Sequence, residues 1–209
     1  AKLLGMDPWL INPMAARCGE VATGSPDGLA CVQSQADAML AKVRRKFKEY
    51  GINEKPFVVV KADAGSMGAG VLTVRDAREI DAERLRRALA RPQAEDGEVT
   101  EVIIQEGVPT YERINEAVAE PVVCMIDRYV IGGYYRVHAE RGVDENLNAP
   151  GSSYVPLAFA EGHQLPARGA KPGASPPNRF YMYGVIGRLA MLAASYELEA
   201  TDPDAESYD

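Results

Sequence analysis

Residues 57–74 read Phe-Val-Val-Val-Lys-Ala-Asp-Ala-Gly-Ser-Met-Gly-Ala-Gly-Val-Leu-Thr-Val. The β-branched residues at both ends predict strands at 57–61 and 71–74, because such side chains suit an extended backbone. The glycines between them predict a long turn, since glycine accepts backbone conformations that other residues avoid. We therefore expect an antiparallel hairpin with a glycine-rich tip.

This hairpin is the candidate phosphate site. An ammonium at the end of the first strand can neutralise phosphate charge, and glycine-rich backbone can offer its N–H groups to phosphate oxygens. The loop lacks the Gly-Lys-Ser/Thr ending of a Walker A motif, and the strand that follows it excludes a Rossmann fingerprint. A mobile hairpin with an exposed lysine is the alternative. The expected ATP-binding residues here are Lys61, Gly65, Ser66, Gly68 and Gly70.

A second candidate stands at the exit of a strand expected over residues 99–105. A carboxylate beside backbone groups that are free to form hydrogen bonds suits a hinge that holds adenine and ribose. An ordinary turn with a solvated glutamate is the alternative. The candidate nucleotide-binding residues are Gln105, Glu106 and Val108.

A third candidate joins Arg136 to an oxygen-rich segment at 144–151. An arginine can bind a phosphate or carboxylate in a forked pair, and carboxylate and amide oxygens suit Mg²⁺. A solvated turn closed by Asx hydrogen bonds is the alternative. The candidates are Arg136, Arg141 and Asn146 for substrate, and Glu145 and Asn148 for metal.

The remaining elements set the fold class. Apolar spacing predicts a helix at 32–50 ended by Gly51, with its basic residues on a solvated face. Further helices are expected at 76–91 and 179–198, and Gly132-Gly133 is expected to turn a hairpin between strands at 121–129 and 134–138. Because strands and helices do not alternate strictly, the order favours an α+β fold over a doubly wound sheet.

Composition narrows the functional classes. Hydrophobic residues make up 46% and charged residues 25% of the 209 residues, as in a globular protein. The formal net charge of −7 argues against general nucleic-acid binding. No apolar run is long enough to span a membrane. Cys18, Cys31 and Cys124 show no metal-binding spacing, so we expect reduced thiols in a cytoplasmic protein.

The three candidates occur in an order that is similar to the ATP-grasp superfamily. Longer strings resemble the proteobacterial type of glutamate–cysteine ligase across nearly the whole chain. They are FVVVKADAG (57–65), VIIQEGV (102–108), EPVV (120–123), MIDRYV (125–130), YRVH (135–138), GVDENLNAPG (142–151), DPWLINP (7–13) and RFYMYGV (179–185).

That resemblance implies a function. The family uses Mg²⁺ and ATP to convert the glutamate side-chain carboxylate into an acyl phosphate, which the cysteine amine then attacks, in the first step of glutathione synthesis. Lys61 and the glycine loop would hold the phosphates, Arg136 would stabilise developing charge, and Glu106 would contact the nucleotide sugar. Residues 1–55 would connect to an ATP-grasp-type region at 56–209, as part of a longer protein.

Several alternatives stay open at this point. ATP-grasp enzymes usually carry metal ligands near the end of the domain, where this chain offers Glu197, Glu199 and Asp202 in place of Glu145 and Asn148. Another carboxylate–amine ligase with a different amine, or a nucleotide-binding module without turnover, would share the ATP residues. The expected partners are glutamate, cysteine and ATP, and an oligomer is compatible with the sequence.

Overall fold

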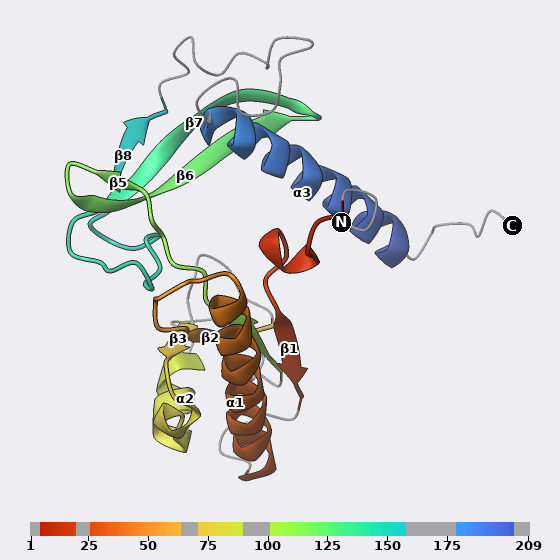
Figure 1. The fold of residues 1–209 in the computed structure, drawn as a ribbon, viewed down its shortest axis with the longest axis vertical. Coiled ribbons are helices and arrows are strands. Elements are labelled where there is room, and N and C mark those ends of the chain that lie inside the picture. The colour runs from red at the N-terminus through yellow and green to blue at the C-terminus, as the bar shows by residue number, and fades with distance from the viewer. Residues whose placement is uncertain (1–4, 20–25, 64–70, 90–100, 158–178, 203–209) are drawn as a thin grey trace, which may run out of the picture. The chain divides into compact units, whose positions relative to one another are not determined.

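The computed structural model describes residues 5–19, 26–63, 71–89, 101–157 and 179–202 (Figure 1). Its strands form two antiparallel four-stranded sheets, accompanied by helices, which confirms the α+β expectation. The chain divides into two compact units. Unit 1 comprises residues 1–111 and 140–150, and unit 2 comprises residues 112–139 and 151–209, so the boundary expected at 55/56 falls inside unit 1.

The sheet of unit 1 has the strand order β1-β4-β2-β3. Its strands are β1 (Ala15–Cys18), β2 (Val58–Ala62), β3 (Val71–Val74) and β4 (Val102–Glu106). The predicted pairing of the two strands around the glycine-rich loop is confirmed, with Val58 opposite Val74 and Lys61 opposite Val71. β4 then pairs with β2 on its other side.

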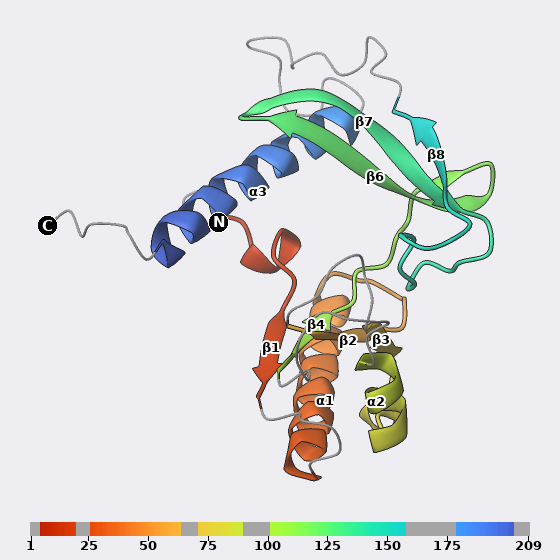
Figure 2. The same ribbon diagram turned by 180° about the vertical axis from the view of Figure 1, so that it is seen from behind.

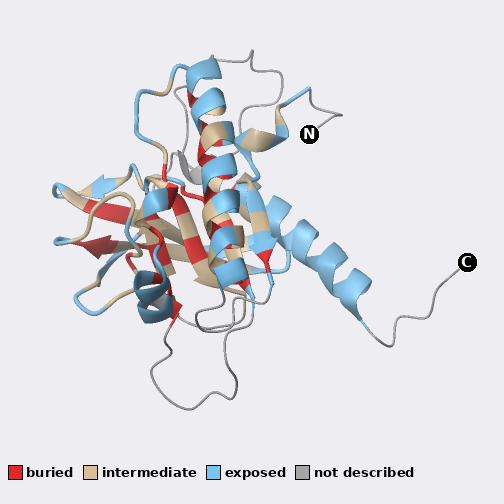
Figure 3. Ribbon diagram, turned by 90° about the horizontal axis from the view of Figure 1, so that it is seen from below, coloured by how far each residue is buried: buried red, intermediate tan, exposed pale blue. Residues whose placement is uncertain are grey.

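Helix α1 (Pro26–Glu49) covers one face of this sheet. It begins six residues before the predicted start at residue 32, because Pro26 suits the first turn of a helix, where no backbone N–H is needed. Gly51 follows the helix with φ +65°, as a C-terminal cap requires. The predicted apolar face is buried (Figure 3), through Val32, Ala36, Met39, Leu40, Val43 and Phe47.

The single helix predicted at 76–91 is wrong in one respect, because two shorter helices replace it. They are η3 (Ala77–Glu79) and α2 (Ala82–Leu89). The carboxylate of Asp76 accepts from the N–H of Arg78, and that of Asp81 accepts from the N–H of Arg84, so two capping residues start two helices. Figure 2 shows α1 and α2 side by side against the sheet of unit 1.

The sheet of unit 2 has the strand order β5-β6-β7-β8. Its strands are β5 (Arg113–Ile114), β6 (Ala117–Ile126), β7 (Tyr129–His138) and β8 (Ser153–Pro156). Helix α3 (Arg179–Thr201) packs on one face, where Tyr183 meets the core of Ala119, Tyr135, Val137 and Leu157. Beyond its first turns the helix is exposed within unit 2.

The hairpin predicted at Gly132-Gly133 is also wrong. The chain turns at Asp127, which has φ +50°, and both glycines lie inside β7. A Cβ on Gly133 would lie 2.6 Å from both Leu157 Cδ1 and the Val122 carbonyl oxygen. Close packing, rather than a turn, therefore requires glycine at position 133.

The cysteine prediction needs correction as well. Cys18, at the end of β1, and Cys31, in α1, form a disulfide with their Cα atoms 6.1 Å apart. Cys124 is free and exposed. The spacing of 13 residues gave no indication of this pair, because it joins a strand to a helix that folds back onto it. The expectation of reduced thiols is thus wrong for Cys18 and Cys31.

Candidate functional site

The sheet register of unit 1 places two predicted nucleotide residues on one face. Lys61 lies opposite Ile103, and Gln105 lies opposite Val59, so Lys61 and Gln105 are diagonal neighbours on the same side of the sheet. Val58, Val60 and Ile104 point to the other face, where they pack in the core with α1 and α2. Lys61 and Gln105 therefore lie on the face away from these helices. We call it the open face; Lys61 and Gln105 are both half-buried on it.

The glycine loop joins the end of β2 to the start of β3. Gly65, Ser66, Gly68 and Gly70 lie outside the described residues. The ends are fixed, because the N–H of Asp63 donates to the carbonyl of Glu101 at 3.1 Å, and Val71 pairs with Lys61. The structure therefore holds both ends of the predicted phosphate loop in a regular sheet.

The segment 140–150 is attached to the same open face. The Thr73 hydroxyl donates to the carbonyl oxygen of Asp144 at 3.4 Å, and Arg75 forms an ion pair with the Asp144 carboxylate. Thr73 lies on the side of β3 that faces away from the helices, since Leu72 and Val74 are in the core, and Arg75 follows the strand directly. The sequence did not indicate this connection, because Thr73 and Asp144 are 71 positions apart.

Within that segment two of the three predicted substrate residues, Arg141 and Asn146, contact each other. Arg141 donates from Nη1 to the carbonyl oxygen of Asn146 at 2.8 Å. The Asn146 side-chain oxygen accepts from the N–H of Asn148 at 2.9 Å, which is an Asx turn. Glu145 Oε2 accepts from the N–H of Gly142 at 2.7 Å. The loop is thus stabilised by hydrogen bonds among its own residues.

The predicted metal ligands fall into separate groups. Glu145 and Asn148 belong to unit 1, whereas Glu199 lies in the exposed last turns of α3 in unit 2. Among the described residues no three His, Cys, Asp or Glu side chains gather as they would around a metal ion. A Mg²⁺ ion that arrives with a nucleotide needs only one or two protein carboxylates, because phosphate oxygens supply other ligands.

Glu106 points to the opposite side of the sheet from Gln105. Its carboxylate is 4% exposed and accepts from the Trp9 indole N–H at 2.8 and 2.9 Å and from the Met14 N–H at 3.0 Å. Val108, two residues later, is 64% exposed. The structure therefore places Gln105 and Val108 where a ligand can contact them, and it engages the Glu106 carboxylate with the N-terminal segment.

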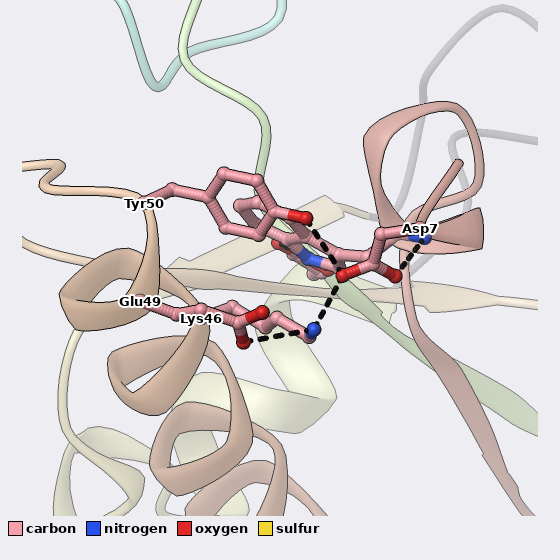
Figure 4. Close-up of polar contacts among 6 residues, drawn as sticks. Asp7, Lys46, Glu49 and Tyr50 are labelled. Atoms are coloured by element: carbon pink, nitrogen blue, oxygen red, sulfur yellow. Dashed lines mark hydrogen bonds and ion pairs between the residues drawn. The ribbon is translucent and has the colours of Figure 1, made fainter. Parts of the chain in front are cut away.

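The N-terminal segment is held by a polar cluster that the sequence analysis did not single out (Figure 4). Asp7 caps the short helix η2 (Pro8–Leu10) and accepts from Lys46 at 2.5 Å and from the Tyr50 hydroxyl at 2.9 Å. The hydrogen bond from Lys46 is the main reason that the pKa of Asp7 falls to about 2. Lys46, predicted to be solvated, therefore anchors residues 7–10.

Arg136 lies in unit 2, on the face of the sheet opposite α3. Its neighbours across the strands are Glu120 on β6 and Tyr154 on β8, and its Nη1 donates to Glu120 Oε1 at 2.5 Å. Burial alone would lower the pKa of Arg136, but hydrogen bonds to Glu120 and Tyr134 raise it. Glu120 is a site candidate that the sequence did not indicate. Its position opposite Arg136 depends on the register of β6 and β7.

Comparisons with known proteins bear on the whole chain. The family described as glutamate–cysteine ligase matches residues 1–198. A crystal structure from Methylobacillus flagellatus KT, of a protein assigned as a candidate gamma-glutamylcysteine synthetase, is 44% identical and superposes with a TM-score of 0.77. The match covers 97% of this chain and 48% of that one, so this chain spans about half the length of that protein. No curated protein matches the chain.

Proposed function

The chain belongs to the glutamate–cysteine ligase family, and from that premise we propose that it is the ATP-binding portion of an enzyme that joins glutamate to cysteine. One structural observation supports this most. Lys61 and Gln105 lie on the open face of one sheet, and segment 140–150 is attached to the same face through Thr73. An ATP-grasp-like arrangement of this kind would bind a nucleotide along that face.

The chemistry requires an activated carboxylate. The glutamate side-chain carboxylate attacks the γ-phosphorus of ATP, which forms an acyl phosphate and releases ADP. The cysteine amine then attacks the acyl carbon, phosphate leaves with the electron pair of the broken C–O bond, and the amine loses a proton. Phosphoryl transfer depends mainly on positioning and on charge stabilisation, so cationic side chains and backbone N–H groups are the residues it needs.

The chain supplies these groups at defined positions. Lys61 would neutralise phosphate charge from the open face, and the backbone of Gly65, Ser66, Gly68 and Gly70 would cradle phosphate oxygens. Gln105 and Val108 would contact the base and sugar. The Glu106 carboxylate lies on the other side of the sheet, so its proposed contribution to the nucleotide site is indirect, through the hydrogen bonds that hold Trp9 and Met14 beside β4.

The remaining candidates would act on charge and substrate. Arg136, in unit 2, would stabilise negative charge on a bound substrate, and Arg141 and Asn146, in unit 1, are separate proposed substrate-binding residues. Mg²⁺ bound with ATP would supply further neutralisation of the phosphates. Glu145 and Asn148, which supply oxygens from a single turn, are its proposed protein ligands, and Glu199 is the alternative. A cytoplasmic location is proposed from the biosynthetic reaction.

The decisive experiment is ADP release from Mg²⁺-ATP with glutamate and cysteine, omitting each in turn. Release that requires both amino acids supports the proposal and identifies the amine. Release that requires glutamate but accepts a different amine would indicate another carboxylate–amine ligase. ATP binding with no ADP under any combination would indicate a nucleotide-binding portion without turnover.

Variants connect the outcome to the open face. Lys61→Ala should weaken ATP binding about 10- to 100-fold, because a charged contact to phosphate is lost. Lys48→Ala, which removes the same charge from the exposed face of α1, is the matched control and should leave binding unchanged. Equal ATP affinity in both variants would argue against the open face as the nucleotide site.

A further inference from the structure

A charged pair on the sheet of unit 2 has hydrogen-bonding capacity to spare. Glu120 and Arg136 face each other on β6 and β7, with side chains 32% and 19% exposed. The Arg136 Nε is buried and has no hydrogen-bond partner among the described residues. In the same described part, only the Oε1 oxygen of Glu120 accepts a hydrogen bond, from Arg136. Buried donors are rarely left without an acceptor, so the pair needs an explanation.

We propose that Arg136 and Glu120 form the subsite for the α-carboxylate and α-ammonium groups of an amino-acid substrate. Arg136 would donate to the carboxylate, and Glu120 would accept from the ammonium. The inference rests on the proposed function, since both substrates of that reaction are α-amino acids. It specifies the α-carboxylate as the substrate group that Arg136 binds, and it adds Glu120 as the residue that binds the α-ammonium.

The charges of the pair select a zwitterion over other ligands. A guanidinium has a flat edge of N–H donors that matches a carboxylate, and a carboxylate oxygen accepts from an ammonium. A phosphate dianion would gain from Arg136 but would be repelled by Glu120, whose carboxylate is held beside the guanidinium. An amino acid presents both charges at once, so it satisfies both partners without leaving a net charge in a half-buried place.

The neighbouring side chains suit a small ligand. Tyr134 and Tyr154 lie on the same face, with their rings in an edge-to-face contact and their centroids 5.4 Å apart. Tyr154 is 60% exposed, so this side of the pair is open within unit 2. The aromatic rings form a wall beside the charged pair.

Equilibrium binding of labelled L-glutamate and L-cysteine to the whole chain tests the subsite. Analogues remove one group at a time. γ-Aminobutyrate and cysteamine lack the α-carboxylate, and glutarate and 3-mercaptopropionate lack the α-ammonium. Arg136→Lys should weaken the parent amino acid about 10- to 100-fold and leave the analogue without a carboxylate unchanged. Glu120→Gln should do the same for the ammonium. Comparing glutamate with cysteine shows which substrate uses the subsite.

The controls separate binding from folding and from activity. Glu83→Gln and Arg87→Lys alter an exposed ion pair on α2 and should change the affinity for neither glutamate nor cysteine. Near-ultraviolet circular dichroism checks that each variant is folded. Unchanged amino-acid affinity in folded Arg136→Lys and Glu120→Gln, or weakened ATP affinity instead, overturns the subsite. Amino-acid binding that depends on both residues, in a chain that releases no ADP, supports the subsite while the proposed function fails.

Discussion

Each of the two sheets has a glutamate on one of its strands, and the two carboxylates differ in burial and in hydrogen-bond partners. In unit 1, Glu106 is 4% exposed, and its hydrogen bonds within the described residues come from neutral donors, the Trp9 indole and the Met14 N–H. In unit 2, the Glu120 side chain is 32% exposed and pairs with Arg136, whose Nε has no acceptor in the described part of the chain. The first carboxylate completes an anchor for the N-terminal segment, whereas the second has capacity left for a ligand.

This difference follows from the surroundings of each strand. The core of unit 1 is built from α1, α2 and all four strands, and the disulfide and the Asp7 cluster tie residues 7–18 to it. The core of unit 2 is small and gathers around Ala119, Tyr135, Val137 and Leu157. The Glu106 carboxylate is therefore enclosed in unit 1, whereas the Glu120 side chain is partly exposed in unit 2.

Removing the disulfide should have the largest effect on unit 1. The Cys18→Ala/Cys31→Ala variant should lose about 3 kcal/mol of unfolding free energy, because a closed loop of this length restricts the unfolded chain. Urea unfolding followed by the fluorescence of Trp9, the single tryptophan, reports on unit 1. Cys124→Ala is the control and should change nothing. If dithiothreitol shifts the wild-type midpoint and the double variant does not respond, the disulfide is responsible.

Exchanging each carboxylate for an amide tests the comparison directly. Glu106→Gln should cost about 2 kcal/mol, because the amide keeps one acceptor and turns an N–H₂ group toward the Trp9 or Met14 donor. Glu120→Gln should cost less than about 1 kcal/mol, since water can solvate a half-exposed pair. Glu101→Gln, at an exposed position next to β4, is the control. An equal loss of unfolding free energy in Glu106→Gln and Glu120→Gln would mean that the two carboxylates do not differ as a structural anchor and a ligand site.

A pair of adjacent glycines tests packing in unit 2. Gly133→Ala should cost about 1–3 kcal/mol, because its Cβ would lie 2.6 Å from the Val122 carbonyl oxygen. Gly132→Ala should cost much less, since a Cβ there meets nothing within 4 Å. Tyrosine circular dichroism during urea unfolding follows unit 2. A shift of similar size in both variants would mean that backbone freedom, and not close contact, decides these positions.

The sequence predicted the unit 1 sheet well, because its signals are local. The β-branched runs around the glycine loop and the apolar spacing of α1 specify strand and helix without reference to distant residues. The α+β class followed from the order of these elements. Glycine misled the prediction at Gly132-Gly133, since a residue that permits a turn also permits close packing, and only Leu157 reveals which applies.

The sequence indicated individual candidate residues for the site but not their arrangement in space. Lys61 and Gln105 were each proposed for the nucleotide, and their shared face follows from a register that no single strand encodes. The opposite orientation of Glu106 follows from strand alternation once Gln105 is placed. The contacts Trp9–Glu106 and Thr73–Asp144 join residues 97 and 71 positions apart, so they could not be inferred from spacing.

The smallest expected effect concerns acid, and it tests whether the anchor of unit 1 is electrostatic. The pKa of Asp7 is about 2 in the folded chain, mainly because Lys46 donates to it, against an ordinary value of 3.8. The unfolded chain therefore takes up the proton first as the pH falls, and the stabilisation from Asp7 is present above about pH 4 and lost toward pH 2. Asp7→Asn should flatten the pH dependence of the Trp9-monitored midpoint in that window, while Asp81→Asn at an exposed position should retain it. An identical acid limb in wild type and Asp7→Asn would mean that Trp9 and Glu106, rather than the charge on Asp7, hold the N-terminal segment in place.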